Sequence, residues 1–563
     1  MADFYKRRAV RILPALLIML VVVLITGCLT MWPNEMVATG ESALAALFSA
    51  SNVFFWWDTD YFASAADTKV LLHTWSLAVE EQFYLLYPAL LVAVGKFAPG
   101  RLPVVLAAVV IVSFAIGAVL GGAAPSAAFY LLPSRAWELA IGGLAAVVPA
   151  DRLGARNRRT IVALAGLALV IASLFVVRSH WRFPVPWAAL PCVGAALVIA
   201  FGEGTPAGRL LSLAPLRWIG LISYSLYLWH WPLITFWRLE HGFALGAGEQ
   251  IGLLIATLAL GALSYRFVEQ PFLRRYRHAA PRPVLWSASL AAAAVAAALA
   301  LVVTDPPLWR SSDRHTLEVA AYADYRARAD YAYQFRRGQC FTSASKGEAY
   351  RFDTCLDLSA DKPNLVVLGD SHAAQYWRAI AEGLPRWNVL QGTASGCHPT
   401  LHGGGWPACR RVVDTVLGPL LSTGRVQTVI LAARWRKADV AALAETIARI
   451  RQAGAQAIVV GPTIEYEAEV PSLLARLMAD GRTADLASLR VADRSALDRA
   501  VAKAAHGAGA TYVSALAIEC PAEGCRTFAP DGAPMQFDYG HLTLSGARWV
   551  VAGMKLPRVL RPA

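Results

Sequence analysis

The stretch "NLVVLGDSHAAQYW", residues 364 to 377, decides the fold of the second half of the chain. Its apolar run ends at Gly369-Asp370-Ser371-His372, and a pattern typical of a helix follows. The same alternation continues downstream. We expect strands at "NLVVLGD", "WNVLQG", "VQTVILAA", "AQAIVVGP" and "ATYVS", and helices over 373–383, 411–421, 438–453, 485–507 and 543–555. Strands that alternate with helices predict an α/β/α domain with a mostly parallel sheet over residues 361–563.

Ser371 stands where such a sheet usually presents catalytic groups, at the carboxyl end of a strand. A serine nucleophile needs a base, and the base needs a partner that orients it. "FDYGHLTLSGA" offers both, because Asp538 and His541 are three residues apart before a helix. We therefore predict a Ser371–His541–Asp538 triad. His372 ranks below His541 as the base, since side chains adjacent in sequence usually point apart.

The cysteines are distributed differently in the two halves of the chain. Two of the eight, Cys28 and Cys192, lie in apolar stretches, and the other six follow residue 330 in three sequence-local pairs. An even number of cysteines in one polar domain predicts disulfides and an oxidising compartment. The local pairings are Cys340–Cys355, Cys397–Cys409 and Cys520–Cys525, although other pairings remain open. The cysteine and histidine spacings do not predict a zinc site, and we expect no metal.

The first half of the chain has the composition of a membrane domain. The whole chain is 56% hydrophobic and 16% charged, and its mean hydropathy is +0.45. We expect nine spans, near 12–31, 75–93, 103–121, 136–149, 160–177, 187–201, 217–236, 248–268 and 284–304. The predicted parts are a membrane domain (1–283), an additional transmembrane helix (284–304), a linker or cap (305–360) and the α/β domain (361–563).

Positive charge predicts the orientation of these spans. The net charge of +13 fits Lys and Arg in cytoplasmic loops, and no basic patch with interleaved aromatics supports nucleic-acid binding. With the N-terminus inside, sixteen Lys and Arg fall in inner loops. Five fall in outer loops: Lys69, Arg135, Arg178, Arg182 and Arg238. Nine crossings then place the α/β domain outside, in agreement with the cysteines.

Polar side chains interrupt several of the predicted spans. Ionisable groups there normally face a cavity on a functional pathway, although those near the interface can reach water instead. Arg8 and Arg11 lie three apart on one helical face and suit phosphate oxygens, but spacing alone favours simple positive-inside anchoring. The candidate cavity residues are His73, Glu80, Arg135, Glu138, Tyr224 and His230.

The membrane half resembles the acyltransferase-3 family of integral membrane acyltransferases. The motifs "FYKRRAVRILPAL", "LLHTWSLAVEEQFYLLYP", "SRAWELAIGG", "IGLISYSLYLWHWP" and "VEQPF" occur in the family's order across residues 4–273. The resemblance implies transfer of an acyl group, usually acetyl from acetyl-CoA, to an extracytoplasmic sugar hydroxyl. It implies that Arg8 and Arg11 bind the donor's phosphates, and it favours the cavity role of the six residues named above.

The second half resembles the SGNH hydrolase family, through "GDSH" early and "DYGH" late. The resemblance implies that Ser371, Asp538 and His541 form the triad and that the Ser371 N–H is one oxyanion donor. In the family, the second sequence block supplies a glycine to the oxyanion hole, and the resemblance implies that this glycine is Gly392 or Gly396. The third-block asparagine is missing, because the corresponding strand reads "VILAARW", with Arg434 and Trp435 near that position. We therefore expect an incomplete or differently built oxyanion hole.

The membrane half also departs from its family. Members usually have two further spans before the arginine motif, with a histidine regarded as catalytic, whereas here "DFYKRR" almost directly follows Met1. We expect either that the sequence is a piece of a longer protein, which we favour, or that its transferase half is inactive.

Acyltransferase-3 proteins fused to SGNH domains modify envelope polysaccharides, typically by O-acetylating lipopolysaccharide O-antigen. We therefore expect an O-acetyltransferase of the bacterial inner membrane with a periplasmic C-terminal domain. It would bind no cofactor, use acetyl-CoA as donor substrate, and act on a polysaccharide or lipid-linked glycan. The alternatives are a membrane-anchored carbohydrate esterase with an inactive membrane half, and a transporter with a binding domain.

Overall fold

The computed structural model of the chain describes residues 1–58, 66–147, 156–178, 181, 183–243, 245–276, 279–306, 310–311, 313–343, 349–522 and 524–560. Arg152 and Arg277, two of the sixteen inner-loop charges counted above, and Arg182, one of the five outer-loop charges, lie outside these residues. The chain forms two compact units. One comprises Met1–Thr59, Lys69–Arg238 and Ala244–Pro307, and the other comprises Asp60–Thr68, Leu239–Phe243 and Leu308–Ala563.

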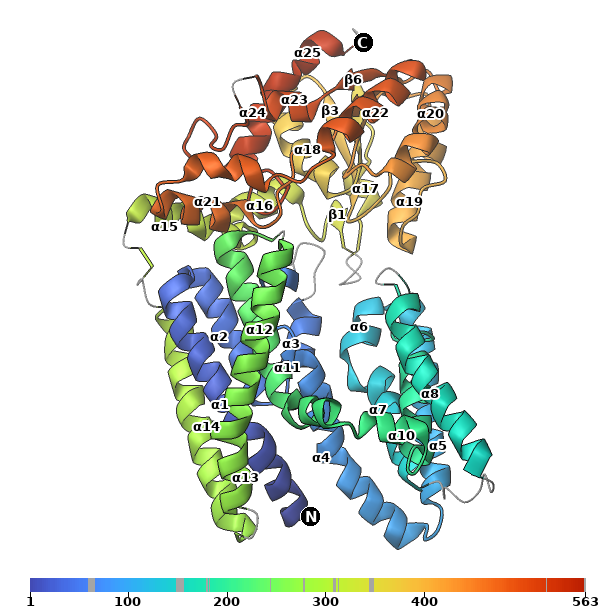
Figure 1. Cartoon of the computed structure of the whole chain (residues 1–563). Helices are drawn as coiled ribbons and strands as arrows, with labels where there is room; N and C mark the ends of the chain where they lie inside the picture. The colour runs from blue at the N-terminus through green and yellow to red at the C-terminus, as the bar shows by residue number, and fades with distance from the viewer. Residues whose placement is uncertain are drawn as a thin grey trace. The chain divides into compact units, whose positions relative to one another are not determined.

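Each of the nine predicted spans coincides with a helix of the first unit (Figure 1). These helices are α1 (Ala2–Thr30), α4 (Thr74–Phe97), α5 (Leu102–Ala123), α7 (Leu132–Val147), α8 (Arg156–Val176), α9 (Ala189–Phe201), α11 (Ala214–His241), α12 (Ala247–Ser264) and α14 (Pro281–Thr304). Further helices lie between them in the chain: α2 (Pro33–Leu47), α3 (Ser51–Asp58), α6 (Pro125–Tyr130), α10 (Pro206–Leu211) and α13 (Gln270–Tyr276).

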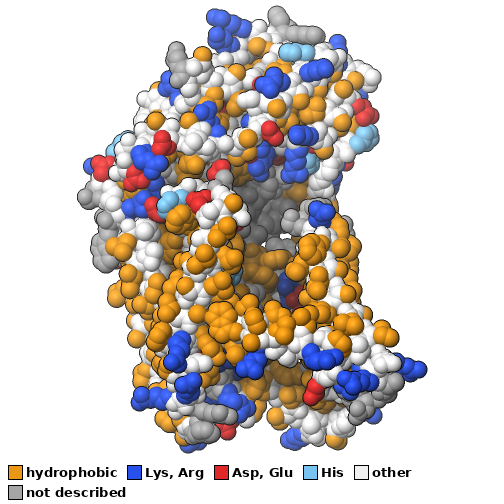
Figure 2. Space-filling view, in the orientation of Figure 1, with side chains coloured by type: hydrophobic (Ala, Val, Ile, Leu, Met, Phe, Trp, Pro, Cys, Tyr) orange, Lys and Arg blue, Asp and Glu red, His pale blue; other side chains and the backbone are white. Residues whose placement is uncertain are grey.

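Six helical segments among the described residues are long and apolar enough to cross a bilayer. They contain α1, α4, α5, α8, α14 and a continuous stretch from α12 through α13. The predicted spans α7 and α9 are shorter, with 16 and 13 residues. Figure 2 shows hydrophobic side chains over the flank of this unit, with Lys and Arg gathered at its lower end. This is the surface of a multi-pass membrane protein.

Small residues let α8 and α9 approach closely. A Cβ built on Gly166 would lie 2.7 Å from the carbonyl oxygen of Gly194, and one on Gly194 would lie 2.6 Å from that of Gly166. The two backbones therefore touch at these glycines, as is usual where membrane helices pack without a hydrophobic driving force.

The second unit is built on a six-stranded parallel sheet with the order β1-β3-β2-β4-β5-β6. The strands are β1 (Phe341–Thr342), β2 (Asn364–Gly369), β3 (Asn388–Ala394), β4 (Val426–Ala432), β5 (Gln456–Val460) and β6 (Thr511–Val513). The last five are the predicted strands. The fold class predicted for this half, an α/β domain with a parallel sheet, is thus confirmed.

Helices cover both faces of the sheet. The main ones are α18 (Ser371–Gly383), α19 (Pro407–Thr415), α20 (Lys437–Gln452), α21 (Val470–Ala479), α22 (Arg494–Gly507), α23 (Ala515–Glu519) and α24 (Leu544–Met554). Side chains alternate along β2, so that Leu365 and Val367 join the core beneath α18 and α24. Val366 and Leu368 join the opposite core, with residues of α19 and α20.

The segment predicted to be a linker or cap is part of the second unit. It forms α15 (Arg314–Ala320), a 3-10 helix (Ala321–Ala327), α16 (Ala329–Phe335), β1 and α17 (Phe352–Cys355). Its strand pairs with β3, and its aromatic side chains build a core cluster with Phe537 and Ala374. The domain therefore begins well before residue 361, because this segment completes both the sheet and the core beside the predicted triad.

Candidate active site

The predicted nucleophile lies on a sharp turn between β2 and α18. A Cβ on Gly369 would lie 1.8 Å from the carbonyl oxygen of Ala432, so only glycine fits where the chain turns. Asp370 caps α18 and accepts hydrogen bonds from the backbone N–H groups of His372 and Arg434, each at 2.8 Å. Burial raises the pKa of Asp370 to about 6, although these two donors act in the opposite direction.

The structure brings Ser371, His541 and Asp538 together in one hydrogen-bonded chain. His541 Nε2 lies 2.8 Å from Ser371 Oγ, and His541 Nδ1 lies 2.8 Å from Asp538 Oδ2. All three side chains are buried. Burial by itself would raise the pKa of Asp538, but His541 and the Arg326 guanidinium hold that pKa well below its usual range. This arrangement can take a proton from the serine and stabilise the imidazolium that forms.

His372 does not serve as the partner of Ser371. Its Nδ1 lies 3.1 Å from Thr463 Oγ1, and its ring packs on the ring of His541 with centroids 4.4 Å apart. Burial, followed by the charges of His541 and Arg434, lowers the pKa of His372 well below its ordinary value. The ring of His372 therefore packs against the predicted base as a neutral imidazole.

The two candidate oxyanion glycines occupy different places. Gly392 lies inside β3, and a Cβ there would contact the core side chains of Val416, Leu368 and Val366 at 3.2–3.6 Å. Gly396 follows the end of β3 in a turn with φ of 59°. Of the two, Gly396 is thus at the carboxyl edge of the sheet. Ser371 opens the 13-residue helix α18, whose N-terminus favours negative charge.

Residues before the sheet support the triad, and sequence reasoning missed them. Arg326 Nη2 lies 3.3 Å from Asp538 Oδ2. Gln334 Nε2 donates to the carbonyl oxygens of Gln375 at 2.9 Å and Leu542 at 3.2 Å. This segment showed no hydrophobic period, and no local motif marks Arg326 or Gln334 as neighbours of the triad.

The position of the missing asparagine is filled by Arg434 and Trp435. Trp435 points inward, is 1% exposed and donates through Nε1 to the carbonyl oxygen of Val460 at 2.7 Å. Arg434 instead donates to the buried carboxylate of Glu465 from Nε at 3.2 Å and from Nη2 at 2.8 Å. A cation therefore stands at this edge of the sheet in place of an amide.

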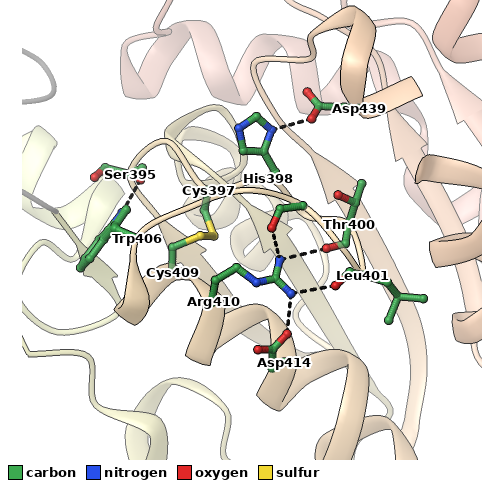
Figure 3. Close-up of a disulfide and its surroundings, with 11 residues drawn as sticks. Ser395, Cys397, His398, Thr400, Leu401, Trp406, Cys409, Arg410, Asp414 and Asp439 are labelled. Atoms are coloured by element: carbon green, nitrogen blue, oxygen red, sulfur yellow. Dashed lines mark hydrogen bonds and ion pairs between the residues drawn. A yellow bond between two sulfur atoms is a disulfide. The ribbon is translucent and has the colours of Figure 1, made fainter. Parts of the chain in front are cut away.

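The loop that follows β3 is fixed by a disulfide and by one arginine (Figure 3). Cys397 is bonded to Cys409, and Arg410 donates to the carbonyl oxygens of Thr400, Leu401 and Gly403 at 2.9–3.0 Å. His398 Nδ1 lies 2.5 Å from Asp439 on α20. The other two local pairs, Cys340–Cys355 and Cys520–Cys525, are also disulfides.

In the membrane unit, polar residues line one face of α4. Arg8 lies over the ring of Tyr84 at 3.5 Å, and the Tyr84 hydroxyl donates to Glu80 at 2.6 Å. The Tyr227 hydroxyl donates to the carbonyl oxygen of His73. The rings of His73 and His230 pack edge to face with centroids 5.6 Å apart. The structure thus gathers four of the predicted donor and cavity residues along this helix.

The remaining predicted membrane residues have other partners. Arg135 pairs with Glu138 at 2.9 Å and lies over the ring of Trp75 at 5.1 Å. The Tyr224 hydroxyl donates to the carbonyl oxygen of Ile12 at 2.9 Å. Arg11 is exposed on α1.

Glu269, in the "VEQPF" motif, is a buried carboxylate that sequence reasoning did not single out. It accepts a hydrogen bond from Ser225. Its place in a quoted motif was the available signal.

Both halves of the chain match models of known families. Residues 1–266 match the model described as "Acyltransferase domain", and residues 339–555 match "SGNH domain (fused to AT3 domains)". The chain is also 32% identical over 280 residues to the "Putative membrane-bound transacylase BcsY" of Komagataeibacter xylinus, spanning 49% of this chain and 70% of that protein. The chain belongs to the acyltransferase-3 family. It carries the SGNH domain that is fused to such membrane domains.

Other relatives of this acyltransferase-3 chain include named O-acetyltransferases. It is 31% identical over 303 residues to the "Peptidoglycan O-acetyltransferase OatA" of Listeria monocytogenes, covering 48% of the chain and 46% of that protein. The chain thus spans about half the length of such relatives. A solved Salmonella Paratyphi A lipopolysaccharide acetyltransferase periplasmic domain is 20% identical, with a TM-score of 0.36, over 43% of the chain and 97% of that domain.

Proposed function

We propose that this protein is a membrane O-acyltransferase whose donor is a cytoplasmic acyl-CoA and whose transferred group is acetyl. The acceptors in this proposal are hydroxyls of envelope polysaccharide such as lipopolysaccharide O-antigen. In this proposal the SGNH domain completes the transfer through an acyl-Ser371 intermediate. The observation that carries the proposal is the hydrogen-bonded Ser371–His541–Asp538 chain in a protein of the acyltransferase-3 family.

The triad supports both halves of a ping-pong acyl transfer. Ser371 Oγ attacks the carbonyl carbon of the incoming acyl group while His541 Nε2 takes the serine proton. The leaving group departs with that proton, and acyl-Ser371 remains. The acceptor hydroxyl then gives its proton to His541 as its oxygen attacks the acyl carbon. Ser371 leaves and recovers the proton, so that a glycan ester is the product.

On the membrane side, Arg8 and Arg11 bind the phosphates of the donor. A guanidinium fork matches phosphate oxygens, and Arg8 is held in place over the ring of Tyr84. The polar face of α4 then lines the path of the acyl group, with Glu80, His73 and His230 along it. Arg135, Glu138 and Tyr224 contribute further polar groups to this membrane cavity.

The proposed location is the bacterial inner membrane, with the SGNH domain in the periplasm. Three disulfides support an oxidising compartment for that domain. The excess of Lys and Arg in the predicted inner loops supports the matching orientation of the helices.

The test compares envelope polysaccharide from cells that carry the chain, its Ser371→Ala variant, the control Ser422→Ala, or no copy. Ester-linked acetyl is quantified by NMR. We expect the chain and Ser422→Ala, which changes an exposed surface serine, to raise acetylation equally, and Ser371→Ala to abolish the increase. If the chain instead lowers acetylation and Ser371→Ala restores it, the protein is an esterase. If no version changes acetylation, the proposal fails.

A further inference from the structure

Arg434 and the nucleophile are held side by side by the sheet itself. Gly369 of β2 pairs with Ala432 of β4 in the parallel register. Ser371 and Arg434 each lie two residues beyond that pair, at the same edge. The carboxylate of Asp370 joins the two turns, because it accepts the N–H of Arg434 as well as that of His372.

The guanidinium of Arg434 is oriented by its neighbours. It forms two hydrogen bonds to Glu465, which is 1% exposed. It also lies 4.6 Å above the ring of Tyr539, a residue that stands between Asp538 and His541 in the sequence. A salt bridge in which both oxygens of the carboxylate take part fixes the plane of the fork. The side chain remains 38% exposed, so it forms part of the rim of the site.

Positive charge is in excess at this rim. Glu465 also accepts a hydrogen bond from Arg494 Nη2 at 2.6 Å, so that two guanidinium groups share one carboxylate. This three-residue group therefore has a net charge of +1. Burial is the main cause that lowers the pKa of His372, whose ring packs on that of His541, and the charges of Arg434 and Arg494 act in the same direction.

Resting on the proposed function, we propose that Arg434 is a catalytic residue whose guanidinium stabilises the oxyanion formed when Ser371 attacks an acyl group, and that Glu465 is its positioning residue. As the Ser371 Oγ–carbon bond forms, the carbonyl electron pair moves to oxygen and the serine proton moves to His541. The negative oxygen then lies between the Ser371 N–H and Arg434. When the carbonyl re-forms, the leaving group takes the proton from His541, and the charge disappears.

This placement explains how the site works without the third-block asparagine. A preorganised positive group aimed at developing charge lowers the barrier because it needs no reorganisation during the reaction. Trp435 cannot fill this role, since its indole N–H is committed to Val460 inside the domain. Gly392 cannot either, because it lies within β3.

The test measures hydrolysis of an aryl acetate by the purified full chain in detergent, with kcat and KM determined separately. We expect Arg434→Ala to lower kcat roughly 10²–10³-fold with little change in KM, as for loss of one oxyanion donor. Arg434→Lys keeps the positive charge but not the forked guanidinium group, so its kcat should fall less than that of Arg434→Ala. Added methylguanidinium should restore part of the kcat of Arg434→Ala, which a residue with only a structural role would not show.

The matched control is Arg425→Ala, which removes an exposed arginine at the opposite end of the same strand. We expect its kcat to equal that of the wild type, and Ser371→Ala gives the background rate. The inference is overturned if Arg434→Ala retains full kcat, or if both Arg434 variants lose kcat equally without rescue while their thermal unfolding is unchanged. If the wild type does not exceed Ser371→Ala, the proposed function itself fails.

Discussion

Single buried carboxylates do much of the positioning at the residue scale. Asp370 joins the ends of β2 and β4 through two backbone N–H groups, and Glu465 holds two arginines. Asp538 accepts the backbone N–H groups of Gly540 and His541 as well as the imidazole. Asp370 and Asp538 each fix a turn that carries a side chain of the candidate site, and Glu465 orients the Arg434 side chain. Each of the three acids has partners for its charge.

Glu519 is a buried acid with a different effect. Burial raises its pKa from 4.5 to about 8, although the N–H of Ile464 donates to it at 3.2 Å. The folded state therefore keeps a proton that the unfolded state loses. The contribution of Glu519 to the free energy of unfolding is therefore fully present below pH 4.5 and is lost as the pH rises to about 8.

We predict that the thermal unfolding midpoint of the full chain falls less between pH 5 and pH 8 in Glu519→Gln than in the wild type. The control is Glu382→Gln, because a hydrogen bond from Arg548 lowers the pKa of Glu382 and its contribution has the opposite sign. Equal falls in the wild type and Glu519→Gln, measured by differential scanning fluorimetry, would contradict this assignment.

Disulfides shape the connecting segments at the scale of the element. Cys340–Cys355 closes the segment that contains β1 and α17, and Cys397–Cys409 closes the loop after β3. Cys520–Cys525 closes a shorter turn after α23. The sequence separations are 15, 12 and 5 residues, so the longer loops lose more conformational entropy when unfolded chains are cross-linked.

We predict that double Cys→Ser replacement costs about 3 kcal/mol of unfolding free energy for each of the two longer loops and about 2 kcal/mol for Cys520–Cys525. Chemical unfolding of the full chain in detergent, monitored by tryptophan fluorescence, measures these losses and should show the smallest one for Cys520–Cys525. Cys192→Ser serves as the control, since its thiol is not in a disulfide. A larger loss at Cys520–Cys525 than at either longer loop would refute the loop-closure explanation.

At the scale of the whole molecule, the chain joins a helical membrane unit to an α/β unit with its own sheet and cores. The proposed reaction requires that the second unit lies on the side of the membrane where polysaccharide is exposed. Its disulfides and the charge distribution of the loops give the same expectation from independent physics.

We predict that alkaline phosphatase fused to the C-terminus of the chain is active, because that enzyme needs an oxidising compartment to form its disulfides. A fluorescent protein that folds only in the cytoplasm should be dark at the same position. The same reporters fused after Gly100, in a predicted inner loop, should show the reverse. Cytoplasmic fluorescence from the C-terminal fusion would exclude the periplasmic orientation.

The sequence by itself determined the elements that local pattern encodes. Each of the nine spans predicted from apolar length coincides with a helix, and six helical segments among the described residues are long and apolar enough to cross a bilayer. Strand-helix alternation predicted β2 to β6, because such patterns repeat within a few residues. The triad was also predictable, since each of its two motifs is local and parallel strands end at one edge. The prediction of one helix over 485–507 was wrong. Asp493, with φ of 72°, separates a 3-10 helix (Thr483–Leu489) from α22.

Only the tertiary structure decided which distant residues support the site. Arg326 lies 212 residues before Asp538, and Gln334 lies 208 residues before Leu542, so no local period connects these pairs. The tertiary structure also turned Trp435 inward and Arg434 toward Glu465, a choice between neighbours that the sequence left open. The physical reason is that hydrogen-bond partners of buried groups are set by packing across the sheet, whereas periodicity records only which face of its own element a residue occupies.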